Sequence, residues 1–320
     1  MQASSFPVTT PDGTALHVNR WLPDGPPKAI VQIAHGMAEH SDRYERFAEE
    51  LTAAGYAVYA NDHRGHGKTA VTPDAVGYFA DQRGFETVVE DMHRVTEQAR
   101  KEQPDLPLFL IGHSMGSFLS RSYAARFGRG LAGLILSGTA GDPGALGKVG
   151  LGLALLQGRL RGRRHPSGLL DTLTFGQYGS AFKPNRTKFD WLSRDEAEVD
   201  KYIADPKCGE LFTAGFFADL LGGLASINND ATVSRVPKGL PIHLMSGSRD
   251  PVGDNGKGVT QVADQFRRLG VTDVTVKLWP DGRHEMLNEI NRDEVSAELI
   301  AWLDAHLEQA QAPSASDPGV

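Results

Sequence analysis

The sequence predicts an α/β protein with a mostly parallel central sheet of about eight strands, flanked by helices and covered by an inserted helical cap. Short apolar runs alternate with amphipathic segments through the first 140 residues and again after residue 236. Runs that are apolar almost throughout are typical of strands buried on both faces of a parallel sheet. Between these parts the alternation stops. We therefore expect a core of residues 1–140 and 237–309, a cap of residues 141–236 and a disordered tail of residues 310–320.

Local signals define the individual elements in chain order. The predicted strands are residues 4–10, 15–22, 29–34, 56–61, 106–111, 131–137, 242–246 and 274–279. The predicted helices are residues 41–54, 85–102, 118–127, 256–269 and 292–308. The Pro11-Asp12-Gly13 turn joins the first two strands as a hairpin. We expect Ser41 to cap the first helix and Gly55 to end it, while apolar residues at helical spacing mark the second.

The composition excludes several classes of protein. With 40% hydrophobic residues, 23% charged residues and a net charge of −7, the chain reads as an ordinary globular protein without general nucleic-acid binding. Cys208 is the only cysteine, which excludes an intrachain disulfide and a cluster of zinc-bound thiolates, and we interpret it as an inert, partly buried thiol. The chain shows neither a secretory signal nor an apolar run of membrane-spanning length, so we expect a cytoplasmic protein.

The segment IGHSMGS, residues 111–117, is the strongest functional signal in the chain. It contains a G-x-S-x-G pattern formed by Gly112, Ser114 and Gly116, between a predicted strand and a predicted helix. On such a turn the serine hydroxyl is held out of the sheet, and a side chain at either glycine would collide with the crowded backbone. In a glycine-rich chain the pattern alone can arise by chance, so its partners decide the interpretation.

A serine hydroxyl is a weak nucleophile that needs a base, and the base needs an acid to orient it. His284 follows the last predicted strand, and Asp250 follows the strand before it, with Asp254 as the nearest competitor. Both residues would therefore lie at the carboxyl edge of the sheet. The order Ser114, Asp250, His284 is the nucleophile–acid–base order of the α/β-hydrolases.

An oxyanion hole requires two backbone N–H groups directed at the developing charge. We expect one from Met115, directly after the nucleophile, and the other from Met37, in the loop that follows the strand at 29–34. Gly36 would let this backbone approach closely.

Two nearby loops carry histidines that allow another interpretation. His35, His40, His63 and His66, with Asp62, could form a hydrolytic metal site. No helical H-E-x-x-H spacing supports it. The alternative is a set of hydrogen bonds among these histidines, Asp62, Arg64 and Glu39 that shapes the floor of the site.

Several segments together resemble the monoacylglycerol lipase and lysophospholipase branch of the α/β-hydrolases, which is also grouped with the serine aminopeptidase-like hydrolases. These segments are HGMAEHS (35–41), DHRGHG (62–67) and GHSMG (112–116), with Asp250 and His284. The resemblance extends from about Phe6 to Leu307, and residues 189–206 resemble the cap of bacterial members. It implies the α/β-hydrolase fold, the triad and oxyanion residues named above, and no cofactor or metal. Met37 departs from the usual smaller residue and would narrow the acyl pocket or its entrance.

The start of the cap allows two interpretations. Apolar residues recur there at helical spacing, namely Leu146, Val149, Leu153, Leu156 and Leu160, and a basic group follows, namely Arg159, Arg161, Arg163 and Arg164. The segment is either a lid that contacts a membrane or micelle transiently, with arginines that meet phosphate, or a cap helix packed on the core. Its glycines weaken a helix and could give a lid mobility.

We therefore expect a serine hydrolase that cleaves carboxylic esters of mono-acyl lipids, monoacylglycerol or lysophospholipid, through an acyl-enzyme. The alternatives are a short-chain carboxylesterase, a small-peptide or amide hydrolase with the same triad, and a binding protein on this scaffold. Acidic cap residues that would suit a substrate amine, or form one solvated helix face, are Asp195, Glu196, Glu198 and Asp200.

Overall fold

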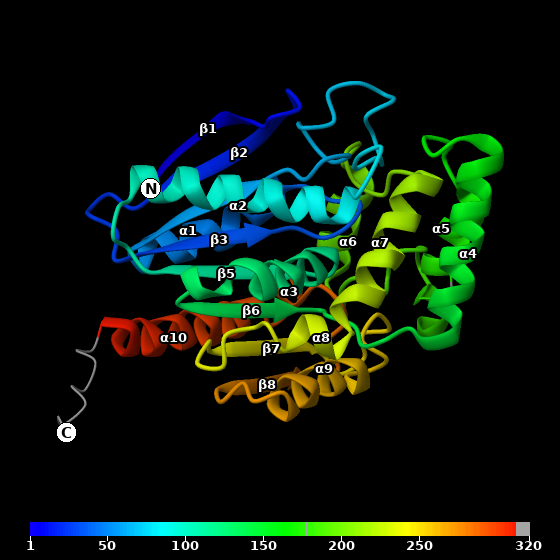
Figure 1. Ribbon diagram of the computed structural model, residues 1–320. Helices are drawn as coiled ribbons and strands as arrows, with labels where there is room; N and C mark the ends of the chain where they lie inside the picture. The colour runs from blue at the N-terminus through cyan, green and yellow to red at the C-terminus, as the bar shows by residue number, and fades with distance from the viewer. Residues whose placement is uncertain (177, 312–320) are drawn as a thin grey trace.

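The computed structural model describes residues 1–176 and 178–311, and within them it has one eight-stranded sheet with helices on both faces (Figure 1). The strands are β1 (Gln2–Thr9), β2 (Ala15–Leu22), β3 (Ala29–Ala34), β4 (Tyr56–Asn61), β5 (Leu108–His113), β6 (Gly133–Ser137), β7 (Ile242–Gly247) and β8 (Val274–Trp279). The helices that flank the sheet are α1 (Glu45–Ala53), α2 (Gly84–Glu102), α3 (Met115–Phe127), α9 (Lys257–Arg268) and α10 (Arg292–Gln311). The predicted α/β class is confirmed.

The strand order brings distant loops together. It runs β1-β2-β4-β3-β5-β6-β7-β8 across the sheet. The pairs β1–β2 and β2–β4 are antiparallel, and the other neighbours are parallel. The loops after β3, β5, β7 and β8 therefore meet at one edge of the sheet, where sites in open α/β sheets form.

Helices cover both faces of the sheet, which explains the apolar strands. Leu110 of β5 belongs to a buried cluster with Val88 of α2 and Leu119 of α3. The next residue, Ile111, belongs to a second cluster with Phe47 of α1. Because successive side chains of a strand point to opposite faces, a strand covered on both sides must be apolar throughout.

The start of the first helix differs from the prediction. Residues Ser41–Tyr44 form a 3-10 turn, and α1 begins at Glu45. The prediction that Ser41 caps this helix is wrong, because its N–H and hydroxyl both donate to Asp62 Oδ1, at 2.8 and 2.6 Å. A buried carboxylate is a strong acceptor and takes the hydroxyl away from the helix end. Gly55 follows the helix with φ +88°, the left-handed conformation expected of a terminating glycine.

Two other helix ends also differ. α3 begins at Met115, three residues before the predicted start, because the turn at Ser114 leads directly into the helix. α10 continues to Gln311, so residues 310 and 311 of the predicted tail are helical. The rest of that tail, residues 312–320, lies outside the described residues.

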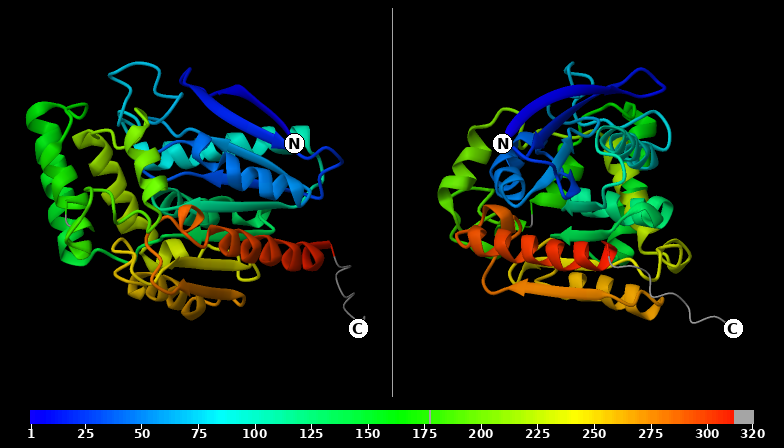
Figure 2. Two further views of the ribbon diagram at one scale, coloured as in Figure 1. Left: turned by 180° about the vertical axis from the view of Figure 1, so that it is seen from behind. Right: turned by 90° about the vertical axis from the view of Figure 1, so that its left-hand side faces the viewer.

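The interrupting segment contributes its own helices at one end of the sheet. They are α4 (Gly144–Arg161), α5 (Gly168–Phe175), α6 (Glu196–Ala204), α7 (Ala214–Ile227) and α8 (Asp230–Val233). Figure 1 and Figure 2 show α4, α5 and α7 beside one another at the end to which the arrowheads of β3, β5 and β6 point. We propose that residues 141–236 form a cap on a core of residues 1–140 and 237–309.

Helix α4 has one packed and one exposed apolar side. Ala154 is fully buried, and Leu153 packs against the main core cluster. Leu146 and Leu160 are 84% and 74% exposed. The helix continues through its glycines without a break. It is therefore a packed cap helix that also presents an apolar outer face.

The basic residues after α4 contact the protein itself. Arg163 pairs with Asp219 at 2.8 Å, and the Arg164 guanidinium lies 4.0 Å from the Tyr78 ring centroid. These two arginines therefore have partners within the chain. In the described part of the chain, no helix combines the length and apolar character needed to cross a bilayer.

The turn between β5 and α3 is built on two glycines. A Cβ added to Gly112 would lie 2.4 Å from Ser120 Oγ and 2.5 Å from the Gly116 carbonyl oxygen. A Cβ on Gly116 would lie 2.0 Å from the carbonyl oxygen of Ala34, at the end of β3. Both distances are far below van der Waals contact, so the collision that the sequence pattern predicts at these positions is confirmed.

Gly116→Ala should lower the free energy of unfolding by about 1–3 kcal/mol, because the new methyl group would collide with the Ala34 backbone. Gly152→Ala is the matched control, since a Cβ there meets nothing within 4 Å and the residue is exposed within α4. It should be neutral or stabilise by about 0.5–1 kcal/mol. Urea unfolding followed by circular dichroism measures both, and equal stabilities of the two variants would contradict the packing argument.

Candidate active site

Ser114 sits at a strained turn between β5 and α3. Its φ of 52° and ψ of −118° lie outside the regions that L-residues usually occupy. The N–H of Ser117 donates to the Ser114 carbonyl at 2.8 Å, which closes the turn. The Ser114 side chain lines two cavities that open from this point. The turn therefore has the geometry expected of a serine held up at a strand-to-helix elbow.

His284 and Asp250 form a buried pair beside this turn. Nδ1 of His284 lies 2.9 Å from Oδ2 and 3.0 Å from Oδ1 of Asp250, and the two side chains are 2% and 0% exposed. Ser246 Oγ and the Val252 N–H also donate to this carboxylate, at 2.7 and 2.9 Å. The competitor Asp254 is instead largely exposed and pairs with Lys257.

The pair perturbs both pKa values. Burial alone would disfavour the imidazolium, but the adjacent Asp250 carboxylate outweighs burial and raises the pKa of His284 above 6.5. Burial would likewise raise the pKa of Asp250, but His284 and the other donors lower it. Asp250 is therefore a carboxylate at neutral pH, placed to hold the ring through Nδ1 and leave Nε2 for another partner.

The two predicted oxyanion donors flank Ser114. Met115 is the first residue of α3, and Met37 lines the same two cavities as Ser114. Neither the Met37 nor the Met115 N–H has a hydrogen-bond acceptor among the described residues. Gly36 approaches Ser114 closely, since a Cβ there would lie 3.2 Å from Ser114 Cβ. Two unpaired N–H groups beside a serine hydroxyl can stabilise a negatively charged oxygen.

A buried ionic network below the serine was missed by the sequence analysis. Arg43 Nη1 donates to Glu39 Oε2 at 2.6 Å, and Arg43 Nη2 donates to Glu285 Oε2 at 2.7 Å. Glu39 Oε1 accepts the Gly36 N–H at 2.5 Å. Burial would raise the pKa of Glu39, but Arg43 lowers it to about 2. The position of Glu285 directly after His284 was the available signal, whereas nothing in the sequence pairs it with Arg43.

The four histidines of the metal hypothesis do not converge. Nδ1 of His35 contacts the Gly36 carbonyl, and Nε2 accepts the His63 N–H at 2.9 Å. His66 Nδ1 contacts the Arg64 carbonyl, while His40 turns to Asp205 in the cap. Burial lowers the pKa of His66 to about 3. The rings of His35, His63 and His66 pack against one another, and burial lowers the pKa of each, which agrees with the hydrogen-bonding alternative.

The partners of that alternative differ from the expected ones. Asp62 accepts from Ser41 and from the Lys68 N–H at 2.6 Å. Arg64 pairs with Asp91 and Asp12, each at 2.6 Å, and not with Glu39. The hydrogen bonds hold the loops to the core and to the N-terminal hairpin.

Two cavities of different character meet at Ser114 and Met37. One, of about 270 Å³, is also lined by His284 and by polar cap residues such as Lys183 and Asn185. The other, of about 700 Å³, lies among apolar side chains such as Leu170, Phe217, Leu220 and Leu224. The site can therefore hold a molecule with one polar and one long apolar part, with the bond between them near Ser114.

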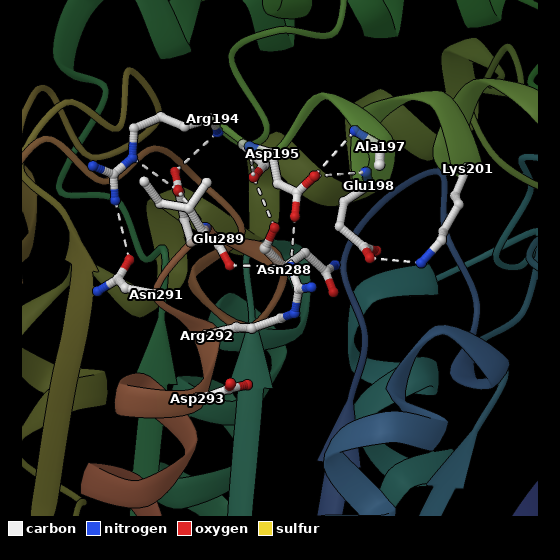
Figure 3. Close-up of polar contacts among 12 residues, drawn as sticks. Arg194, Asp195, Ala197, Glu198, Lys201, Asn288, Glu289, Asn291, Arg292 and Asp293 are labelled. Atoms are coloured by element: carbon white, nitrogen blue, oxygen red, sulfur yellow. Dashed lines mark hydrogen bonds and ion pairs between the residues drawn. The ribbon is translucent and has the colours of Figure 1, made fainter.

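The cap also holds the loop that carries His284. Figure 3 shows Arg194 and Asp195 of the cap paired with Glu289 and Arg292, which follow that loop. The Glu285 N–H donates to the Leu192 carbonyl at 2.8 Å. The fully buried Glu289 accepts the Arg283 N–H at 2.9 Å and pairs with Arg194 Nε at 2.8 Å. Glu289 therefore links the residue before His284 to the cap.

Glu289→Gln should lower the free energy of unfolding by about 2–4 kcal/mol. The neutral amide cannot balance the Arg194 charge, and its single oxygen cannot replace the two carboxylate oxygens that accept the Arg283 N–H and the Arg194 Nε–H. Lys201→Met, which removes the exposed ion pair with Glu198 in the same view, is the matched control and should change it by less than about 0.5 kcal/mol. Urea unfolding compares them, and similar small effects would show that the Glu289 link contributes little.

Comparisons with known proteins identify the family of this chain. Residues 25–291 match the family described as serine aminopeptidase, S33. The monoacylglycerol lipase of Mycolicibacterium smegmatis is 31% identical over 301 residues, which cover 92% of this chain and 95% of that protein. The monoglyceride lipase of Homo sapiens is 29% identical over 314 residues, which cover 96% of this chain and 92% of that protein.

Solved structures show the same likeness. A thermostable carboxyl esterase from Bacillus coagulans, in complex with glycerol, superposes with a TM-score of 0.89 at 31% identity, covering 96% of this chain and 99% of that one. A soluble variant of the monoglyceride lipase from Saccharomyces cerevisiae superposes with a TM-score of 0.72 at 21% identity, covering 95% of this chain and 94% of that one, and supports the fold alone. The chain therefore belongs to the serine aminopeptidase, S33, family, and its fold is that of the α/β-hydrolases.

Proposed function

We propose that this protein hydrolyses the carboxylic ester of a mono-acyl lipid through an acyl-enzyme on Ser114. The observation that carries the proposal is the meeting of a polar and a larger apolar cavity at Ser114 and Met37. An acyl chain fits the apolar cavity, and the alcohol part of the ester fits the polar one. Water then needs to reach only the ester bond, which would lie between the two cavities beside Ser114.

The catalytic roles follow from the chemistry of the three side chains. His284 Nε2 takes the proton of Ser114 while Oγ attacks the ester carbonyl. The N–H groups of Met37 and Met115 stabilise the oxyanion. His284 then protonates the leaving alcohol and activates a water that releases the fatty acid. Asp250 orients the ring and stabilises the imidazolium, and no cofactor or metal takes part.

The relatives support the carboxylic-ester class. The matched proteins include monoacylglycerol lipases and a carboxyl esterase that cover nearly the whole chain. The size and apolar lining of the larger cavity favour a long acyl chain over a short one. A short-chain carboxylesterase is the second candidate, and a series of p-nitrophenyl esters that differ only in acyl length separates the two.

An amide or peptide hydrolase has weaker support. The acidic cap residues that could bind a substrate amine are engaged elsewhere. Asp195 pairs with Arg292 at 2.6 Å, Glu198 with Lys201 at 2.7 Å and Asp200 with Arg186 at 2.7 Å. None of these carboxylates lines either cavity in the described part of the chain.

The outer face of the cap suits contact with a lipid surface. Leu146, Val149 and Leu160 of α4 and Leu169 of α5 are each at least 59% exposed. Leu146 and Val149 also line the apolar cavity. We propose that this face touches a micelle or membrane transiently, so that an acyl chain passes from the lipid into the cavity.

Ser114→Ala should reduce hydrolysis of monoacylglycerol and of p-nitrophenyl esters by at least about 10³-fold, since the nucleophile is removed. The variant should unfold at an unchanged urea concentration and should lose labelling by a fluorophosphonate probe. Ser117→Ala, three residues along and hydrogen-bonded only to the turn, is the control and should keep both activities. Retained hydrolysis in a folded Ser114→Ala protein would exclude the mechanism.

Activity should fall as the pH drops through a value above 6.5, because His284 must be neutral to accept the serine proton and its pKa is raised. In Asp250→Asn the carboxylate that favours the imidazolium is absent, so any residual activity should have its acidic midpoint at lower pH. The dependence of kcat/KM on pH measures both midpoints. A wild-type midpoint below 6.5 would contradict the role of the pair.

A further inference from the structure

A second cluster of potential ligands lies where the cap meets the loop that carries Met37. His40 ends that loop, and its Nε2 lies 2.8 Å from Asp205 Oδ2. Asp205 and Cys208 lie on one turn, which the Cys208 N–H closes by donating to the Asp205 carbonyl at 3.0 Å. The ligand atoms of His40, Asp205 and Cys208 all lie within 4.8 Å of one another. In the described part of the chain, they form the one group of this kind.

The His40 imidazole lies between two carboxylates. Its Nε2 faces Asp205, and its Nδ1 lies 3.6 Å from Asp42 Oδ2. Nδ1 is buried and has no hydrogen-bond partner among the described residues. A neutral ring can donate to only one of the two carboxylates, so the other nitrogen presents its lone pair to negative charge. Both ring nitrogens would have a suitable partner if a metal cation were bound at Nε2 and Nδ1–H pointed to Asp42.

We propose that His40, Asp205 and Cys208 bind a zinc ion. Imidazole, carboxylate and thiolate are the ligands that zinc takes in proteins, at bonds of about 2.0–2.3 Å. The i, i+3 spacing of Asp205 and Cys208 resembles the two-ligand turns of structural zinc sites. Asp42 lies on the Nδ1 side of the imidazole, where a carboxylate commonly orients a metal-bound histidine. Water or Glu210, which lines the polar cavity nearby, completes four ligands.

Binding of the metal ion releases one proton from the site. The thiol proton of Cys208 leaves as the sulfur coordinates, and the single proton of the neutral His40 ring is then held at Nδ1, which leaves Nε2 free for the metal. Cys208 is partly buried against the cap cluster that includes Tyr202 and Trp191, so part of the residue remains open to a small thiol reagent.

The ion would hold the cap to the loop of the proposed oxyanion hole. The Gly209 N–H and the Tyr202 hydroxyl both donate to the Ala38 carbonyl, at 3.0 and 2.9 Å. Ala38 follows Met37 directly. Zinc would replace the existing His40–Asp205 contact by metal bonds between the cap turn 205–209 and this loop, and a tighter-bound ion should stabilise the folded protein more.

The test is metal titration of the full chain without an affinity tag, near neutral pH. Calorimetry should show one Zn²⁺ per chain. Co²⁺ in its place should give the thiolate-to-cobalt charge-transfer absorption, which requires coordination by Cys208. Cys208→Ser and His40→Ala should each weaken binding at least tenfold, and Asp42→Asn about tenfold. His306→Ala is the matched control, because His306 pairs with Asp273 at 3.1 Å without a cysteine nearby, and it should leave affinity unchanged.

A second measurement needs no variant and so remains valid if a substitution prevents folding. One equivalent of Zn²⁺ should slow the reaction of Cys208 with a thiol reagent several-fold, and EDTA should restore it. Cys208 is the only cysteine, so any change in the rate of thiol reaction reports on this residue. The proposal is overturned if Zn²⁺ leaves thiol reactivity unchanged, if Co²⁺ gives no thiolate band, or if Cys208→Ser binds as tightly as the wild type.

Discussion

The approach of Gly116 to the backbone of Ala34 is the contact on which the rest of the site depends. It brings the first turn of α3 against the end of β3, at a distance that no side chain could occupy. The turn that presents Ser114 and the loop that presents Met37 are thereby fixed relative to each other. Because the constraint is steric and involves backbone, it costs nothing when charge develops near the serine, which is the property expected of a preorganised site.

The positions of the strands along the chain and the triad candidates could be predicted because each depends on local signals. Every predicted strand is present. The strands from β3 to β7 are buried on both faces and leave an apolar run that can be recognised without knowledge of its neighbours. The exposed strand β1 is instead marked by the hairpin turn that follows it. Asp250 and His284 could be placed because each follows such a run, and the parallel sheet then brings them to one edge. Their contact in the structure agrees with the placement, while their chemical roles are proposals.

The interactions that could not be predicted join residues far apart in the sequence. Arg43 and Glu285 are separated by 242 positions, and Arg194 and Glu289 by 95. Charged residues in such pairs look like surface residues until the fold buries them together. Ser41 is a case in which a local rule gave a wrong prediction. The rule made it a helix cap, but its hydroxyl donates to Asp62, 21 residues away. A long-range partner outweighs a local capping preference where a buried carboxylate needs hydrogen-bond donors.

The second histidine beside Ser114 has a consequence for where a proton can reside. His113 lines the polar cavity with Ser114, and its ring centroid lies 4.7 Å from that of His284. Burial and the neighbouring His284 lower the pKa of His113 to about 4, whereas that of His284 is raised. The two adjacent imidazoles therefore differ in basicity. In the proposed mechanism, a proton taken from Ser114 would remain on His284 and would not pass to His113.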